Sequence, residues 1–157
     1  MEFLICSVIT INLVAYFIPK RLTKVEMYIS ILFSRAIQSI SDIYLDLGLN
    51  LYGYFAPGVE WLTLIPVFGL YPAFTIIYLN YFPFKSSLLK KCIYIILYSI
   101  CATIFEWLSV KSGYFYYNHW KLWYSAIIYP GLLIILPFNL YILRRIIKLE
   151  YHISNKK

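Results

Sequence analysis

Residues 123–143 read WYSAIIYPGLLIILPFNLYIL, a stretch in which no side chain carries a charge. A helix of this length is about 30 Å long, because each residue adds about 1.5 Å, and the hydrocarbon core of a bilayer is about 30 Å thick. The stretch is too long for a strand and lacks the alternation of apolar and polar residues that a strand needs. We therefore expect it to form a transmembrane helix.

Four more apolar stretches of similar length precede it, at residues 3–18, 25–47, 61–82 and 89–108. Of the 157 residues, 62% are hydrophobic and only 13% are charged, and the mean hydropathy is +0.72. This composition excludes a water-soluble domain and a disordered chain. The sequence predicts an all-α polytopic membrane protein, a bundle of five transmembrane helices that forms a single domain over residues 1–157.

The basic residues predict the orientation of this bundle. The first loop, the third loop and the C-terminal tail together hold 11 Lys and Arg, whereas the N-terminus, the second loop and the fourth loop together hold two. Loops rich in Lys and Arg stay in the cytoplasm. We therefore expect the N-terminus outside and the C-terminus in the cytoplasm, in a multi-pass protein of the plasma membrane.

Aromatic residues fit this orientation. Trp61, Trp107, Trp120 and Trp123 all fall at the outer ends of the expected helices, where indole rings favour the membrane interface. The basic residues form short clusters between apolar stretches, so no folded basic face exists for nucleic acid. The expected partners are membrane lipids, a second copy of this chain or another membrane protein.

The second expected helix is the most polar one. Arg35, Gln38, Ser39, Asp42 and Asp46 share an arc of about 100° on its surface. A charged residue in the middle of a bilayer costs ~2.5–3.5 kcal/mol and needs a partner inside the protein. We expect the polar arc to face the bundle interior and Arg35 to pair with Asp42, directly or through one water.

Further polar residues are expected at the same level of the membrane. Glu60 precedes the third helix, Glu106 lies in the last turn of the fourth, and His119 follows in the fourth loop. Together with the second helix they predict a polar, acidic region in the outer half of the bundle. The candidate ligand- or ion-binding residues are Arg35, Gln38, Asp42, Asp46, Glu60, Glu106 and His119.

Several functions remain open for this region. It can be a structural network, a site for a hard cation, or a pocket for a lipid headgroup or a small cationic ligand. The chain carries no catalytic or nucleotide-binding motif, so we assign no catalytic residue and no cofactor and favour a non-enzymatic role. The alternatives are a cation-dependent membrane enzyme that acts on a lipid-linked substrate and a small oligomeric transporter.

Prolines interrupt two of the expected helices. Pro66 and Pro72 lie in the third, and Pro130 and Pro137 lie in the fifth. Each proline removes one backbone hydrogen bond and frees a carbonyl, which a membrane tolerates only where protein or water satisfies it. We expect kinked helices that leave room for a cavity.

Aromatic and acidic residues form short motifs along nearly the whole chain. They are DIYLD at 42–46, LYGYF at 51–55, FEWL at 105–108, KSGYF at 111–115, and WKLWYS at 120–125 followed by Tyr129 and Pro130. In these motifs the chain resembles a family of small bacterial integral membrane proteins that has no assigned activity. The resemblance implies five helices in a plasma membrane of the Gram-positive type, and it implies no reaction or ligand.

Overall fold

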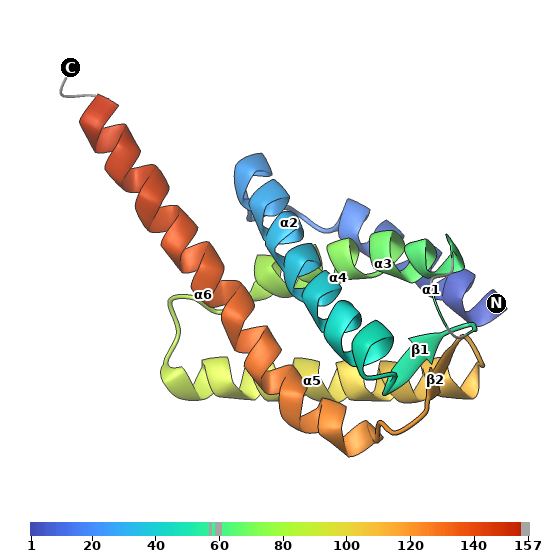
Figure 1. Cartoon of the computed structure of the whole chain (residues 1–157). Coiled ribbons are helices and arrows are strands. Elements are labelled where there is room, and N and C mark those ends of the chain that lie inside the picture. Colours follow the sequence, from blue (N-terminus) through green and yellow to red (C-terminus); the bar gives the residue numbers. More distant parts are fainter. Residues whose placement is uncertain (57, 59–60, 155–157) are drawn as a thin grey trace.

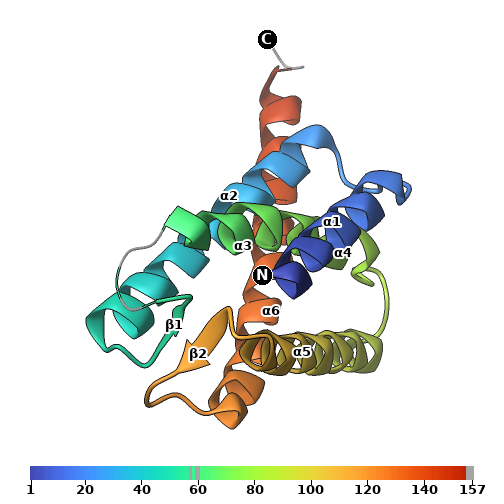
Figure 2. The same ribbon diagram turned by 90° about the vertical axis from the view of Figure 1, so that its right-hand side faces the viewer.

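The computed structural model describes residues 1–56, 58 and 61–154, and helices lie at all five predicted stretches (Figure 1). In chain order the elements are α1 (Glu2–Phe17), α2 (Lys24–Ser41), a π-helical segment (Asp42–Gly48), β1 (Tyr52–Tyr54), a 3₁₀ turn (Trp61–Thr63), α3 (Leu64–Gly69), α4 (Tyr71–Tyr81), α5 (Leu88–Lys111), β2 (Phe115–Tyr117) and α6 (Leu122–Ser154). The helices cross one another at wide angles, and α5 packs against α6 (Figure 2).

Three helical stretches of the described chain are long and apolar enough to cross a membrane. They are Trp61–Tyr81, Leu88–Lys111 and Leu122–Ser154, while α1 is a shorter apolar helix. Helix α2 is not among them and carries three charged residues, Lys24, Glu26 and Arg35. These three stretches identify the chain as a helical membrane protein by length and composition.

Local sequence explains where the first two helices begin and end. Ile18 adopts an extended conformation because Pro19 follows it, and α1 therefore stops at Phe17. Thr23 and Glu26 form a capping box at the start of α2: the Thr23 amide donates to Glu26 Oε2 at 2.8 Å, and the Glu26 amide donates to Thr23 Oγ1 at 3.2 Å. Both signals are local, and Asn80 of α4 adds two hydrogen bonds to the same loop: the Arg21 amide donates to its Oδ1 at 2.6 Å, and its Nδ2 donates to the Pro19 oxygen at 3.0 Å.

The third predicted helix is not continuous: it is interrupted at Leu70, which separates α3 from α4. Two carbonyls beside the break accept side-chain hydrogen bonds from neighbouring helices. Asn12 Nδ2 of α1 donates to the oxygen of Gly69 at 2.7 Å, and Arg35 Nη1 of α2 donates to the oxygen of Val67 at 2.7 Å. Polar side chains of α1 and α2 thus satisfy backbone groups in an apolar setting, as a broken helix in a membrane requires.

The fifth predicted helix carries its prolines inside a continuous α6. Pro137 has no N–H, so the carbonyl of Leu133, four residues earlier, lacks its helical donor. The buried hydroxyl of Tyr78 in α4 donates to this oxygen at 2.8 Å. The expectation that protein groups satisfy a carbonyl freed by proline is therefore confirmed at Pro137.

Helix α6 is also longer than predicted, since it ends at Ser154 rather than at residue 143. At about 1.5 Å per residue its 33 residues extend about 50 Å, and its C-terminal part projects beyond the other elements (Figure 1). The predicted end at 143 followed hydropathy, because Arg144 and Arg145 end the apolar stretch. Those residues are good helix formers, so the helix continues past the apolar segment.

The all-α prediction omits a small sheet. Residues of the second and fourth loops form β1 and β2, which pair antiparallel with Tyr52 opposite Tyr117 and Tyr54 opposite Phe115. A β-carbon at Gly53 would lie 2.6 Å from Cζ of Tyr116, so a larger residue there would have to displace the Tyr116 ring. The pairing places both loops on the same side of the molecule, beside the start of α6 (Figures 1 and 2).

Candidate functional site

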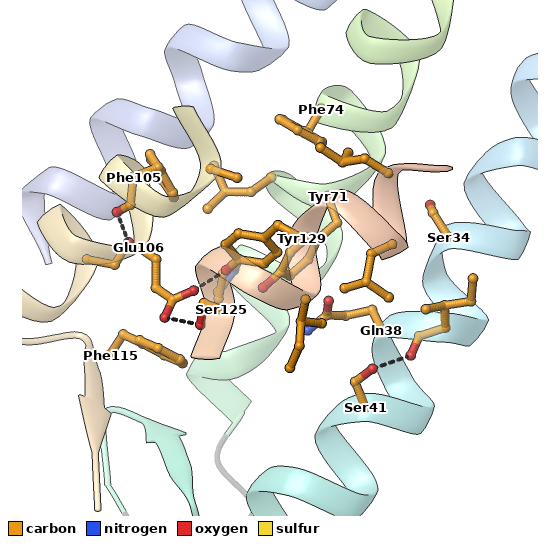
Figure 3. A pocket seen from close by; sticks show the side chains of 18 of the residues that line it. Ser34, Gln38, Ser41, Tyr71, Phe74, Phe105, Glu106, Phe115, Ser125 and Tyr129 are labelled. Atoms are coloured by element: carbon orange, nitrogen blue, oxygen red, sulfur yellow. Dashed lines mark hydrogen bonds between the residues drawn. The ribbon is translucent and has the colours of Figure 1, made fainter. Parts of the chain in front are cut away.

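A cavity of about 420 Å³ lies between the strands and the helices, and its walls come from α1 through α6 and from both strands. Most of its lining is apolar, including Phe74 and Phe105, and the polar groups gather on two sides. Figure 3 shows Glu106 of α5 on one side and Gln38 of α2 on the other, with Tyr129 between them. The cavity is therefore an apolar space with hydrogen-bonding groups at defined places.

Glu106 is the main polar group on the α5 side, and its residue is only 8% exposed. The hydroxyl of Ser125 donates to its Oε1 at 2.6 Å. The Tyr117 hydroxyl also donates to Oε1, and the Tyr129 hydroxyl donates to Oε2. Three hydroxyl groups from β2 and α6 thus hold one buried carboxylate.

Sequence position explains why these donors meet. Ser125 and Tyr129 are four residues apart in α6, so they lie on one face of the helix. Trp120 Nε1 donates to Ser125 Oγ at 2.8 Å and extends the network toward the strands. Burial, followed by the hydrogen bond to Glu106, raises the pKa of the Tyr117 hydroxyl. Tyr117 therefore keeps its proton and remains a donor.

Asp42 lies on the opposite side, at the start of the π-helical segment. Its two oxygens accept from Gln38 Nε2 at 3.0 Å each, and Oδ1 also accepts from the Tyr52 hydroxyl at 3.0 Å. Burial and then the charge of Asp42 raise the pKa of Tyr52. Gln38 and Tyr52 both line the cavity, so Asp42 acts on it through these two neighbours.

The guanidinium of Arg35 makes no direct hydrogen bond or ion pair with Asp42 in the structure, so the direct form of the expected pair is absent and the water-bridged form stays a prediction. It donates to the Val67 oxygen and lies 4.6 Å from the centroid of the Phe68 ring. Within the part of the chain that is described, the ion pair present is Arg144 with Glu26. Arg35 thus satisfies the broken third helix and adds no direct counter-charge to Asp42.

The other candidates lie farther from the cavity. Asp46 is half-buried and lies one turn beyond Asp42. The negative charges of the two carboxylates repel each other. His119 is exposed, and its backbone N–H donates to the Leu51 oxygen at 3.1 Å. Glu60 falls outside the described residues. Of the seven candidates, Gln38 and Glu106 are brought together in the lining of one cavity.

The sequence analysis did not predict the hydroxyl groups that surround the two carboxylates. Tyr54 and Tyr71 also line the cavity, with their hydroxyl oxygens 3.0 Å apart. A signal was present, since Ser125 belongs to the motif WKLWYS and Tyr129 to the Tyr129–Pro130 pair, but these two residues were used only for the family resemblance. No local pattern could tell which of the 17 tyrosines face inward.

The acidic residues that the structure describes do not converge in the way a metal site requires. Across residues 1–56, 58 and 61–154, no three His, Cys, Asp or Glu side chains are close enough together to hold a metal ion. Glu106 and Asp42 instead each hold only neutral hydrogen-bond donors. The arrangement therefore suits an organic ligand better than a bare cation.

Comparison with models of protein families, with curated proteins and with solved structures finds no match to this chain.

Proposed function

We propose that this chain is a multi-pass protein of a bacterial plasma membrane, with its N-terminus outside and its C-terminus in the cytoplasm. In this proposal it spans the bilayer five times and binds one small amphipathic molecule in the cavity, without catalysing a reaction. The observation that carries the proposal is the cavity itself, about 420 Å³ in volume, with a mostly apolar surface into which Glu106 and several hydroxyl and amide side chains are set. Ligand-binding sites in proteins commonly have this size and this distribution of polarity.

The surroundings of the cavity support a ligand that comes from the membrane. Cys101 of α5 and Ile128 of α6 line the cavity and are also exposed on the surface. Both belong to stretches that are long and apolar enough to span a bilayer. In this proposal an amphipathic molecule dissolved in the bilayer enters beside Cys101 and Ile128, without passing through water.

The experiment blocks the cavity by substitution. Ala102 lines it, whereas Ala126 is exposed on α6 and does not, so Ala102→Phe and Ala126→Phe add the same side chain in different places. The full chain in lipid nanodiscs is titrated with 1-octanol, and binding is followed by the fluorescence of the tryptophans, of which Trp120 lines the cavity. We expect saturable binding that Ala102→Phe abolishes and Ala126→Phe retains. No saturable binding to the wild-type chain, or equal binding by both variants, would contradict the proposal.

A further inference from the structure

Glu106 is a buried carboxylate that has no cationic partner among the residues that the structure describes. Its residue is 8% exposed, and the groups that contact its oxygens are the hydroxyls of Tyr117, Ser125 and Tyr129. The one ion pair among the described residues, between Arg144 and Glu26, lies elsewhere in the molecule. A charge buried among neutral groups is costly, so the site favours a ligand that brings the opposite charge.

The direction of the hydrogen bonds shows that these groups suit a carboxylate. Ser125 Oγ receives a hydrogen bond from Trp120 Nε1, so its own proton is directed to Glu106 Oε1. Oε1 accepts from two hydroxyls, whereas Oε2 accepts from Tyr129 alone. Each carboxylate oxygen can accept two hydrogen bonds. Oε2 therefore retains capacity for one more donor.

Aromatic rings surround the same part of the cavity. Figure 3 shows Phe105, Phe115 and Tyr129 near Glu106, and Trp120 and Tyr71 also line the cavity. The faces of such rings attract ammonium groups, and the attraction strengthens where water is excluded. A carboxylate within a set of aromatic rings is therefore matched to an organic cation with an apolar chain.

An anionic ligand is poorly matched to this cavity. Arg35 lies next in sequence to Ser34, which lines the cavity. Its guanidinium donates to the Val67 oxygen and lies over the Phe68 ring. On the α2 side Asp42 adds a second carboxylate held by neutral donors, Gln38 among them. An anionic headgroup would meet repulsion from Glu106 on the α5 side, whereas on the α2 side the charge of Arg35 acts on Asp42.

Resting on the function proposed above, we propose that the ligand is an amphipathic cation whose ammonium group contacts Glu106 and whose apolar chain lies between α4, α5 and α6. The ammonium group donates to Oε2, and its charge balances that of the carboxylate. The apolar residues of the cavity exclude water from this contact.

The test compares four probes with the same alkyl chain: 1-octanol, octylammonium, octyltrimethylammonium and octanoate. Binding to the full chain in nanodiscs of uncharged lipid is measured by tryptophan fluorescence. We expect the wild-type chain to bind octylammonium about tenfold or more tighter than 1-octanol, because hydrogen bonds to charged groups are the stronger ones. Octyltrimethylammonium, which cannot donate, should bind between these two, and octanoate should bind most weakly.

The variants Glu106→Gln and Glu150→Gln provide a matched pair, since Glu150 is exposed near the end of α6. We expect Glu106→Gln to bind 1-octanol as the wild-type chain does but to lose the preference for octylammonium, and Glu150→Gln to keep it. If Glu106→Gln fails to fold, the order of the four probes on the wild-type chain decides. Equal affinity for 1-octanol and octylammonium would overturn the cation proposal and leave the binding cavity intact, whereas binding of no probe would overturn both.

Discussion

Arg144 Nε donates to Glu26 Oε1 at 2.6 Å, and this contact joins α6 to the beginning of α2. The Glu26 side chain is 9% exposed, and the Arg144 guanidinium lies 4.6 Å from the centroid of the Phe84 ring. Glu26 also accepts from the Thr23 amide in the capping box. One carboxylate therefore begins α2 and holds α6 against it.

We expect Arg144→Leu to lower the free energy of unfolding by about 2 kcal/mol, between the cost of losing an exposed pair and that of losing a fully buried one. The measurement is chemical unfolding of the purified chain in detergent. Arg145→Leu is the control, because Arg145 is exposed and stacks on Tyr141. A loss of the same size in both variants would show that the pair with Glu26 has no specific role.

Tyr78→Phe should lower the free energy of unfolding by about 1–3 kcal/mol, because it leaves the buried Leu133 oxygen without a donor. Pro137→Ala restores the N–H that a helix supplies to this oxygen. We therefore expect Tyr78→Phe to be less damaging in a Pro137→Ala background than in the wild-type chain. Unfolding of the two single variants and the double variant tests this. Strictly additive losses would mean that the hydroxyl does not replace the missing helical bond.

The hydrogen bond between Tyr52 and Asp42 should appear as a coupling energy. We expect Asp42→Asn and Tyr52→Phe together to cost about 1 kcal/mol less than the sum of their separate effects on unfolding. Asp42→Asn with Arg35→Met should be closer to additive, because Arg35 binds the Val67 oxygen rather than the carboxylate. A larger coupling to Arg35 than to Tyr52 would indicate that a water joins Arg35 and Asp42.

The orientation is tested by labelling introduced cysteines in intact cells. In a chain whose Cys6, Cys92 and Cys101 are replaced by Ser, we expect Lys121→Cys to react with a membrane-impermeant maleimide and Lys148→Cys to react only after the cells are opened. The expectation follows from the 11 to two distribution of Lys and Arg. The reverse pattern of labelling would place the two strands and the start of α6 on the cytoplasmic side.

The helices could be predicted because their signals are local. Length and hydropathy locate every stretch, and Pro19 and the Thr23–Glu26 pair define the first loop to within one residue. The position of the interruption at Leu70 could not be predicted, because Pro66 and Pro72 indicate that the third helix is interrupted but do not indicate at which residue. The continuation of α6 past Arg144 was missed because hydropathy reports where a membrane ends and not where a helix ends.

The site was predictable only in part. The polar arc of the second predicted helix drew attention to Gln38 and Asp42, and the expected position of Glu106 in the outer half of the bundle drew attention to that residue. The actual partners of Glu106 come from residues that are 11 to 23 positions away in the sequence, so they depend on how β2 and α6 fold back on α5. A periodicity argument treats one helix at a time and cannot supply such contacts.

The pairing of β1 with β2 also imposes an order on biosynthesis. The ribosome makes Tyr52–Tyr54 before α3, α4 and α5, and makes the partner strand only afterwards. The earlier strand must therefore wait unpaired while the intervening helices enter the bilayer. The strand wall of the cavity is complete only when Phe115–Tyr117 has emerged from the ribosome, and Glu106 gains its hydroxyl donors only when the first turns of α6 follow. A chain that stalls before this point therefore has α1 to α5 but lacks the site.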